Sequence, residues 1–260
     1  MNGGHCFLQS TLRTGTTWLR DMLSRNQGLQ VLGEVLSPEV DDLVQLDVPI
    51  RWYQFLVGEL TKDPTNILPR KQRDLFLRYL DMLRQYGMGR VMLIDLKLEQ
   101  LEEVDCISPV IFVPENRFIV LRRLNVLKQV VSEMIMYKRL KDGDTILHRE
   151  FTPKRETVII ETPSLLWHVR RRIDITNRYK KKLDDCGAKA FFMTYEDMIG
   201  QKSHDVLINL QAFLGVKPIN LHSSLAKQNP QHLSELIENY DEVHLAFQAT
   251  EFAYMLFLPS

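Results

Sequence analysis

The sequence predicts an α/β protein with a P-loop-like three-layer fold, in which a central, mainly parallel sheet is flanked by helices. Short apolar runs alternate with longer segments of helical periodicity, a pattern typical of parallel strands joined by crossover helices. The first junction between a strand and a helix also carries a turn rich in glycine and threonine, at 13–18. The chain has 260 residues without repeats or an evident linker, so we expect residues 1–260 to form one domain.

The expected strands are short and apolar. They comprise 5–11, 29–32, 91–98, 117–122 and 189–194, of which 117–122 is the strongest because its β-branched run is uninterrupted. Helices are expected where apolar residues recur at spacings of three and four, from residue 16 and over about 50–59, 71–86, 125–140, 165–186 and 205–214. Residues 141–161 are expected to form an excursion or hairpin outside the core.

Charge and cysteine content restrict the class of protein. The 33 basic and 33 acidic side chains balance, which argues against a nucleic-acid partner, because nonspecific affinity for polyanions needs a basic surplus. Three widely separated cysteines lack the spacing of a metal site, and no secretory signal or stretch long enough to span a bilayer is evident. We therefore expect a soluble, cytoplasmic protein without a membrane partner.

The turn at 13–18 has the residue types of a phosphate-binding loop. It lies where a strand passes into a helix, so backbone N–H groups and the positive end of the helix dipole face a ligand. Gly15 permits close approach of a phosphate, Arg13 adds a positive charge, and Thr14, Thr16 and Thr17 offer hydroxyl groups. An ordinary helix start rich in threonine is the alternative explanation.

A second segment favours the phosphate interpretation. The strand 117–122 ends in Arg122 and Arg123, and Ser132 follows within the next helix. Because the carboxyl ends of parallel strands meet at one edge, Arg13, Arg122 and Arg123 are expected to gather at one crevice. An arginine fork pairs with phosphate in a bidentate manner, and a serine adds a hydroxyl donor.

Together these segments resemble the cytosolic and bacterial sulfotransferases that use 3′-phosphoadenosine 5′-phosphosulfate (PAPS). The loop is similar to the family's PKSGTTW motif, with Arg13 in place of lysine and Thr14 in place of serine. Arg123 and Ser132 resemble the 3′-phosphate motif. The segments 193–198 (MTYEDM) and 212–216 (AFLGV) are similar to TYEDL and FLGV of the family, and 227–230 and 238–241 look like the C-terminal region of bacterial members.

The resemblance implies a PAPS-dependent enzyme that leaves PAP as its product and needs no metal. The implied donor-binding residues are Arg13 with Thr14, Gly15, Thr16 and Thr17 for the 5′-phosphosulfate, and Arg123 with Ser132 for the 3′-phosphate. Trp18 would stack on adenine and Tyr195 would line its pocket. A core position for Trp18 and a structural role for Tyr195 remain the alternatives.

Transfer of a sulfuryl group also needs charge stabilisation and a base. Arg13 is expected to act by charge and hydrogen bonding, since arginine is a poor proton donor. Glu34 resembles the residue of a Gly-Glu pair that carries the base in some bacterial members. Lys97 and Glu99 occupy about the place of the lysine and catalytic histidine of the animal enzymes. Strand alternation predicts that Asp95, Lys97 and Glu99 share one side.

The acceptor is not specified by any motif. An acidic stretch with Glu34, Glu39, Asp41, Asp42 and Asp47 would suit a cationic specialised metabolite, such as a guanidinium alkaloid, although an ordinary solvated loop is the simpler explanation. A carbohydrate or glycolipid is the alternative acceptor, with Trp52, Tyr53, Phe55 or Trp167 stacking on sugar rings. A P-loop nucleotide kinase or a noncatalytic nucleotide-binding module are the rival functions, and a homo-oligomer is left open.

Overall fold

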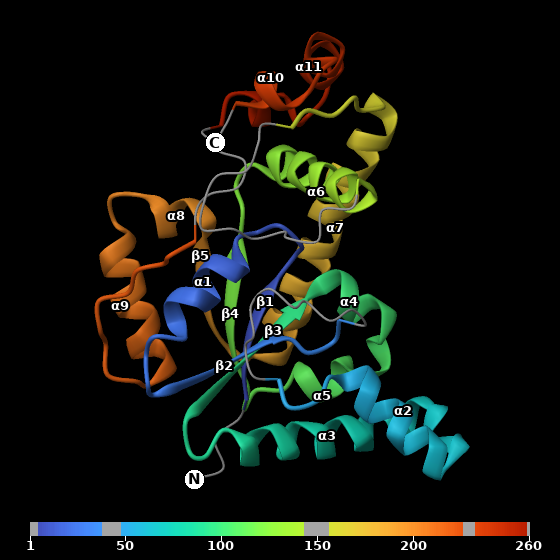
Figure 1. The fold of residues 1–260 in the computed structure, drawn as a ribbon, viewed down its shortest axis with the longest axis vertical. Coiled ribbons are helices and arrows are strands. Elements are labelled where there is room, and N and C mark those ends of the chain that lie inside the picture. Colours follow the sequence, from blue (N-terminus) through green and yellow to red (C-terminus); the bar gives the residue numbers. More distant parts are fainter. Residues whose placement is uncertain (1–4, 38–47, 143–155, 226–231, 259–260) are drawn as a thin grey trace.

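The computed structural model describes residues 5–37, 48–142, 156–225 and 232–258, and it is built around a five-stranded sheet (Figure 1). The strands are β1 (Cys6–Ser10), β2 (Leu29–Glu34), β3 (Val91–Lys97), β4 (Arg117–Arg122) and β5 (Lys189–Thr194). Their order is β2-β3-β1-β4-β5 and every pairing is parallel. The α/β class with a central parallel sheet flanked by helices is therefore confirmed.

The central position of β1 determines where the site lies. β1 pairs with β3 on one side, where Ser10 is opposite Lys97, and with β4 on the other, where Gln9 is opposite Val120. The connection after β1 leads to β2 on one side, and the connection after β4 leads to β5 on the other side, so a topological switch point lies between the adjacent carboxyl ends of β1 and β4. Ligands of open α/β sheets bind at such points.

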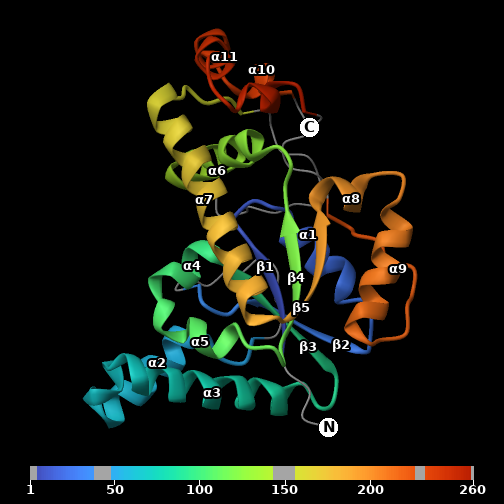
Figure 2. The same cartoon turned by 180° about the vertical axis from the view of Figure 1, so that it is seen from behind.

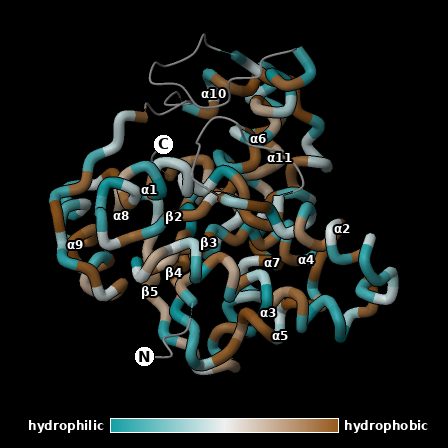
Figure 3. Tube along the Cα trace, turned by 60° about the horizontal axis from the view of Figure 1, so that its bottom comes forward, coloured by the Kyte–Doolittle hydropathy of each residue, from teal (hydrophilic) through white to brown (hydrophobic). Residues whose placement is uncertain are grey.

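Helices cover both faces of the sheet (Figures 1 and 2). One face packs against α1 (Thr16–Leu23) and α9 (Ser203–Leu214). The other packs against α3 (Pro69–Tyr86), α7 (Thr162–Cys186) and the smaller elements between β3 and β4, and α2 (Trp52–Lys62) joins this cluster through Trp52. Hydrophobic and hydrophilic stretches alternate along these helices, as expected when one side of each is buried (Figure 3).

The sequence pattern missed the helices beyond residue 214, which are described below, and several short ones before it. The latter are α4 (Leu98–Glu103), η2 (Asp105–Ile107), α5 (Ser108–Ile111) and α8 (Tyr195–Ile199), together with η1 (Pro64–Ile67) in the loop between α2 and α3. β3 ends at Lys97 instead of residue 98, and Leu98 already begins α4.

A third core lies beyond the carboxyl ends of the strands. It joins α6 (Val126–Lys141) and α7 to α10 (Leu233–Leu236), α11 (Tyr240–Gln248) and η3 (Ala253–Leu256). Val158 and Ile160 are buried in it, and Val158 forms a single bridge with Ile237. The expected excursion is therefore wrong for Val158 and Ile160, because these helices supply an apolar surface that covers both side chains, whereas Ile159 between them is exposed. Residues 143–155 of that segment lie outside the described part of the chain.

Among the residues that the structure describes, no helix combines the length and the apolarity needed to cross a lipid bilayer.

Candidate functional site

Residues 11–17, called the phosphate loop below, connect β1 to α1 through two left-handed backbone conformations. Arg13 has φ 60° and Gly15, the N-cap of α1, has φ 96°. A Cβ atom on Gly15 would lie 2.5 Å from Cδ2 of Tyr195, so the ring occupies the space that a side chain would need. Glycine is required here by conformation and by packing together.

Gln129 of α6 fixes the loop from one side. Its Nε2 donates to Thr11 Oγ1 at 2.6 Å and to Thr14 Oγ1 at 2.8 Å, and it also donates to the Leu12 carbonyl. Thr14 Oγ1 in turn donates to the Thr11 carbonyl at 2.7 Å. The hydroxyl of Thr14, which the sequence placed toward a ligand, is therefore part of the loop's internal bonding.

A charged group on α4, α6 and α7 holds the other side of the loop. Both oxygens of Glu99 accept from the Leu12 N–H at 3.2 Å, and Arg172 Nη1 donates to the Leu12 carbonyl at 2.7 Å. Arg172 is buried and forms ion pairs with Glu99 at 3.1 Å and with Glu133. The loop is thus fixed in shape by side chains from three different helices.

Two of the predicted phosphate-binding residues meet Arg13 directly. Arg13 Nε donates to Ser132 Oγ at 3.4 Å, and Arg123 Nη1 donates to the Arg13 carbonyl at 3.3 Å. The Arg123 guanidinium lies 4.8 Å from the ring centre of Tyr195. Burial and the nearby Arg123 lower the pKa of Arg13 to about 10, which leaves it charged at neutral pH. Arg13, Arg123, Ser132 and Tyr195 therefore form one contiguous positive site.

Arg122 departs from the expected crevice. It follows Val120 on β4 by two positions, and Val120 belongs to the core on the α7 face of the sheet. Because side chains alternate along a strand, Arg122 points to that face. Its Nε and Nη2 and the Nε of Arg123 are buried, and none of the three has a hydrogen-bond partner among the described residues.

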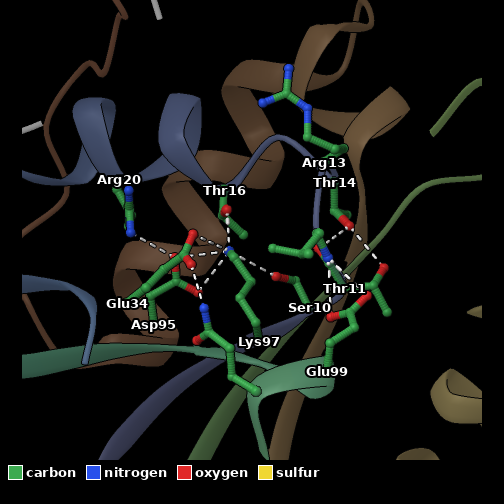
Figure 4. A network of polar contacts seen from close by, with 12 residues as sticks. Ser10, Thr11, Arg13, Thr14, Thr16, Arg20, Glu34, Asp95, Lys97 and Glu99 are labelled. Atoms are coloured by element: carbon green, nitrogen blue, oxygen red, sulfur yellow. Dashed lines mark hydrogen bonds and ion pairs between the residues drawn. The ribbon is translucent and has the colours of Figure 1, made fainter. Parts of the chain in front are cut away.

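Lys97 is the centre of a second charged group, called the Lys97 cluster below, which lies under the start of α1 (Figure 4). Its Nζ contacts both oxygens of Asp95 at 3.0 Å and Oε1 of Glu34 at 3.6 Å. It donates to Ser10 Oγ at 3.2 Å and to Thr16 Oγ1, and Arg20 pairs with Asp95 at 2.8 Å. Two cations and two carboxylates balance within this cluster.

The pKa values follow from that arrangement. Burial would raise the pKa of Glu34, but Lys97, Arg20 and a hydrogen bond from Gln100 at 2.8 Å outweigh it and lower the value. Glu34 is therefore ionised at neutral pH. Burial raises the pKa of Asp95 and of Glu99, against the opposing charges of Lys97 and Arg20 in the first case and Arg172 in the second.

The expectation that Asp95, Lys97 and Glu99 share one side is wrong for Glu99. Asp95 and Lys97 do meet on the α1 face, but Glu99 lies in the first turn of α4 and its carboxylate contacts Leu12 and Arg172. Figure 4 shows Glu99 on the far side of the phosphate loop from Glu34. The end of β3 at Lys97 breaks the alternation that the sequence pattern continues.

The aromatic predictions have mixed outcomes. Trp18 is half-buried against the core on the α1 face, and Tyr195 is buried between Gly15 and Arg123. Trp52 is fully buried, with ring centroids 5.1 Å from Phe76, so it is not available to stack on a sugar. Tyr53 and Phe55 pack on the same core, whereas Trp167 is exposed. The acidic residues 39, 41, 42 and 47, and residues 227–230, lie outside the described ranges.

Sequence reasoning missed the side chains that shape the loop. Gln129 is buried on α6 next to Val130 and Val131, and a polar residue beside these core positions was a usable signal. No sequence feature singled out Arg172, because it follows Arg170 and Arg171 in a basic helix. Only the fold shows that Arg172 is buried while its two neighbours are exposed.

The residues present fit an anionic nucleotide. Arg123 retains a buried nitrogen without a partner in the described structure, and the N-terminus of α1, whose backbone N–H groups favour an anion, directly follows the loop. Within the same residues, no group of three or more His, Cys, Asp or Glu side chains is arranged to hold a metal ion.

No protein-family model matches the sequence, and no curated protein is significantly similar to it. Among solved structures, a sulfotransferase from Alicyclobacillus acidocaldarius is 13% identical with a TM-score of 0.52, and the match covers 98% of this chain and 93% of that chain. A sulfotransferase domain from the curacin biosynthetic pathway is 16% identical with a TM-score of 0.46, covering 84% and 75%. The Alicyclobacillus match shows that the chain has the sulfotransferase fold, as the motifs implied.

Proposed function

We propose that this protein is a sulfotransferase that moves a sulfuryl group from PAPS to a hydroxyl or amine of a small-molecule acceptor. The observation that carries the proposal is the meeting of Arg13, Arg123 and Ser132 at the carboxyl edge of the sheet. Three motifs that are far apart in the sequence, with Tyr195 as the third, form one positive site in a sulfotransferase fold.

Donor binding follows from the charges of the site. Arg123 and Ser132 would hold the 3′-phosphate, and the phosphate loop with the first turn of α1 would hold the 5′-phosphosulfate through backbone N–H groups. Trp18, half-exposed on the first turn of α1, would contact adenine. PAPS supplies an activated sulfuryl group when it is bound.

The structure suggests different roles for Arg13 of the loop and Lys97 at the end of β3. The Arg13 guanidinium is directed at Ser132, which supports a role on the 3′-phosphate side. Lys97 Nζ instead bonds Thr16 on the first turn of α1. An ammonium group both carries charge and donates a proton, so we assign to Lys97 the stabilisation of the leaving group that arginine performs poorly.

Glu34 is the better candidate for the base. Its carboxylate is ionised, lies at the edge of the Lys97 cluster and keeps 17% of its side chain exposed. Glu99 is committed to the Leu12 N–H and Arg172, contacts that position the loop. A general base must be ionised and must reach the proton of the acceptor. The pKa of Glu34 is lowered, whereas burial raises the pKa of Glu99, so the first condition favours Glu34.

The acceptor proposal is a cationic specialised metabolite, such as one with a guanidinium group. Glu34 and Gln100 present acceptor atoms at this edge of the sheet, which supports a cationic partner. A carbohydrate or glycolipid acceptor is less favoured by this structure, because Trp52 is buried and Tyr53 and Phe55 pack on its cluster.

Thermal unfolding with two nucleotides tests the proposal. Without magnesium, PAP at a hundred times its dissociation constant should raise the melting temperature by roughly 5–10 °C. ATP at the same concentration should have a much smaller effect, since it lacks the 3′-phosphate that Arg123 and Ser132 would bind. Equal stabilisation by ATP would favour the kinase alternative. An acceptor screen with PAPS, read as an added SO₃ mass, then identifies the substrate.

A further inference from the structure

A cavity of about 380 Å³ lies on the opposite face of the sheet from α1, between the carboxyl ends of β1 and β4 and the helix α7. Its volume is at the lower end of the range of small-molecule sites, roughly 300–1,000 Å³. Gln9 of β1 and Arg122 of β4 line it, as do Ile173 and Thr176 of α7. Arg123 and Thr11 of the proposed donor site also contribute to its wall, but the proposed transfer reaction assigns no ligand to its interior.

Strand alternation explains why these polar groups face the cavity. Gln9 follows Phe7 by two positions and Arg122 follows Val120 by two, and both apolar residues belong to the core under α7. The phosphate loop leads instead into α1 on the other face. The cavity is therefore distinct from the contact between Arg13 and Ser132, although Arg123 lies in its wall and also contacts the loop.

Two side chains of the cavity wall, Gln9 and Arg122, have buried polar atoms without hydrogen-bond partners among the described residues. Gln9 is only 3% exposed, yet its Oε1 has no hydrogen-bond partner among the described residues. The buried Nε and Nη2 atoms of Arg122 are in the same state. A buried, unsatisfied amide or guanidinium costs free energy that a ligand or water can recover. Arg172, by contrast, is occupied by Leu12, Glu99 and Glu133.

Much of the remaining wall is apolar, with Leu98, Val120, Leu121, Val126 and Ile173. Hydroxyl and amide groups of Ser10, Thr11, Gln129, Thr176 and Thr194 also line it. Exposed Leu124 and Asn177 mark where the cavity reaches the surface. A ligand that fits must therefore have an apolar body and one anionic group. An inorganic anion would leave the apolar wall without contacts, and an uncharged hydrocarbon would leave Arg122 unpaired.

We propose that the cavity binds an organic anion with an apolar body, whose anionic group pairs with Nε and Nη2 of Arg122, and that a hydroxyl on a ligand that carries one donates to Oε1 of Gln9. The two Arg122 nitrogens form one edge of the guanidinium, which is the geometry of bidentate carboxylate or sulfonate recognition. This inference does not depend on the proposed sulfotransferase reaction.

Titration calorimetry with octanoate and naphthalene-2-sulfonate as probes tests the inference. At least one of the two should bind, and octan-1-ol and inorganic sulfate should bind at least ~10-fold more weakly, since each lacks one half of the required chemistry. Arg122→Gln should weaken the anionic probe by ~10-fold or more, and Thr176→Phe should block binding by filling the cavity. Arg70→Gln, on the exposed start of α3, is the matched control and should change nothing.

Several outcomes overturn the proposal. These are no binding of either anion at millimolar concentration, octan-1-ol binding as tightly as octanoate, or full binding to both the Arg122→Gln and the Thr176→Phe variant. The melting temperature of each variant, with and without PAP, shows whether the protein is folded and whether the nucleotide site is intact. A lack of stabilisation by PAP with normal binding of the probe would contradict only the proposed function.

Discussion

The Lys97 cluster and the arginines at the end of β4 differ in how their charges are satisfied. Lys97, Arg20, Asp95 and Glu34 form two cations and two carboxylates at contact distance, on the α1 face of the sheet. At the end of β4, Arg122 and Arg123 bring two positive charges, and buried nitrogens of both lack partners in the described structure. We call the first group closed, because its charges balance within the fold, and the second open, because its buried nitrogens lack partners in the described structure.

The difference separates charges that are balanced within the fold from charges that an anionic ligand can pair. A closed buried cluster fixes the geometry of the strand ends, and removing one member leaves an uncompensated charge. An open group of buried cations instead gains free energy when an anion arrives. The chain has no net charge overall, yet the fold places a locally positive site beside a cluster whose charges balance.

Opening the closed cluster should have the largest effect on stability. Asp95→Asn leaves Arg20 and Lys97 with Glu34 as their only remaining carboxylate, and should lower the free energy of unfolding by about 3–5 kcal/mol. Denaturant unfolding measures this change. Asp184→Asn, which removes an exposed pair with Lys180, is the control and should cost under about 0.5 kcal/mol. Similar losses for both variants would mean that the Lys97 cluster is not a closed unit.

Removing the proposed base should have the next effect, on the rate. Glu34→Gln preserves the hydrogen-bonding shape and should lower kcat by about 10²–10³-fold without changing PAP affinity. Glu99→Gln should change PAP affinity and stability more than kcat, because Glu99 positions the loop through Leu12. Steady-state kinetics with PAP calorimetry separates the two, and the reverse pattern would identify Glu99 as the base.

Removing a cation from the open group should weaken the ligand. Arg123→Ala should reduce PAP affinity by about 2–3 kcal/mol, since charge-assisted hydrogen bonds to the 3′-phosphate are lost. Calorimetry gives the value directly. Arg170→Ala, which removes an exposed pair with Glu251, should leave PAP affinity unchanged. Unaltered affinity in Arg123→Ala would show that the open charges do not serve the nucleotide.

The pH dependence of kcat should show the smallest effect. With Glu34 as the base, its lowered pKa keeps the carboxylate ionised below the ordinary value of 4.5, so kcat stays level down to about pH 5. With Glu99 as the base, the raised pKa makes kcat fall as pH decreases from a value above 4.5. A pH profile measured with enzyme shown to be folded at each pH distinguishes the two.

Much of the fold follows from the sequence because it depends on local patterns. The five strands are apolar runs next to turn residues, and the long helices show clear periodicity, with Gly187 and Gly215 adopting the left-handed conformation at their ends. The helix α4 was not predictable in this way. Leu98 and Glu99 extend the alternation of β3, and only a tertiary contact, the Leu12 N–H bound by Glu99, favours the turn.

The candidate site shows the same limit. The proximity of Arg13 and Arg123 was predictable, because both lie just after the ends of parallel strands, and Ser132 lies in the helix that follows Arg123. The direction of Arg122 depends on which helix covers which face of the sheet, and a single strand does not reveal this. The closed state of the Lys97 cluster depends on Arg20, which looks like any helical arginine in the sequence.

The contact between Gly15 and Tyr195 has an evolutionary consequence. The ring fills the place where any larger residue at position 15 would put its Cβ, so neither position can change freely while the other stays as it is. Across related chains the two positions should covary, with a small side chain at 195 wherever 15 is not glycine. We therefore expect a substitution at position 15 to require a change at Tyr195, although most of the chain separates the two positions.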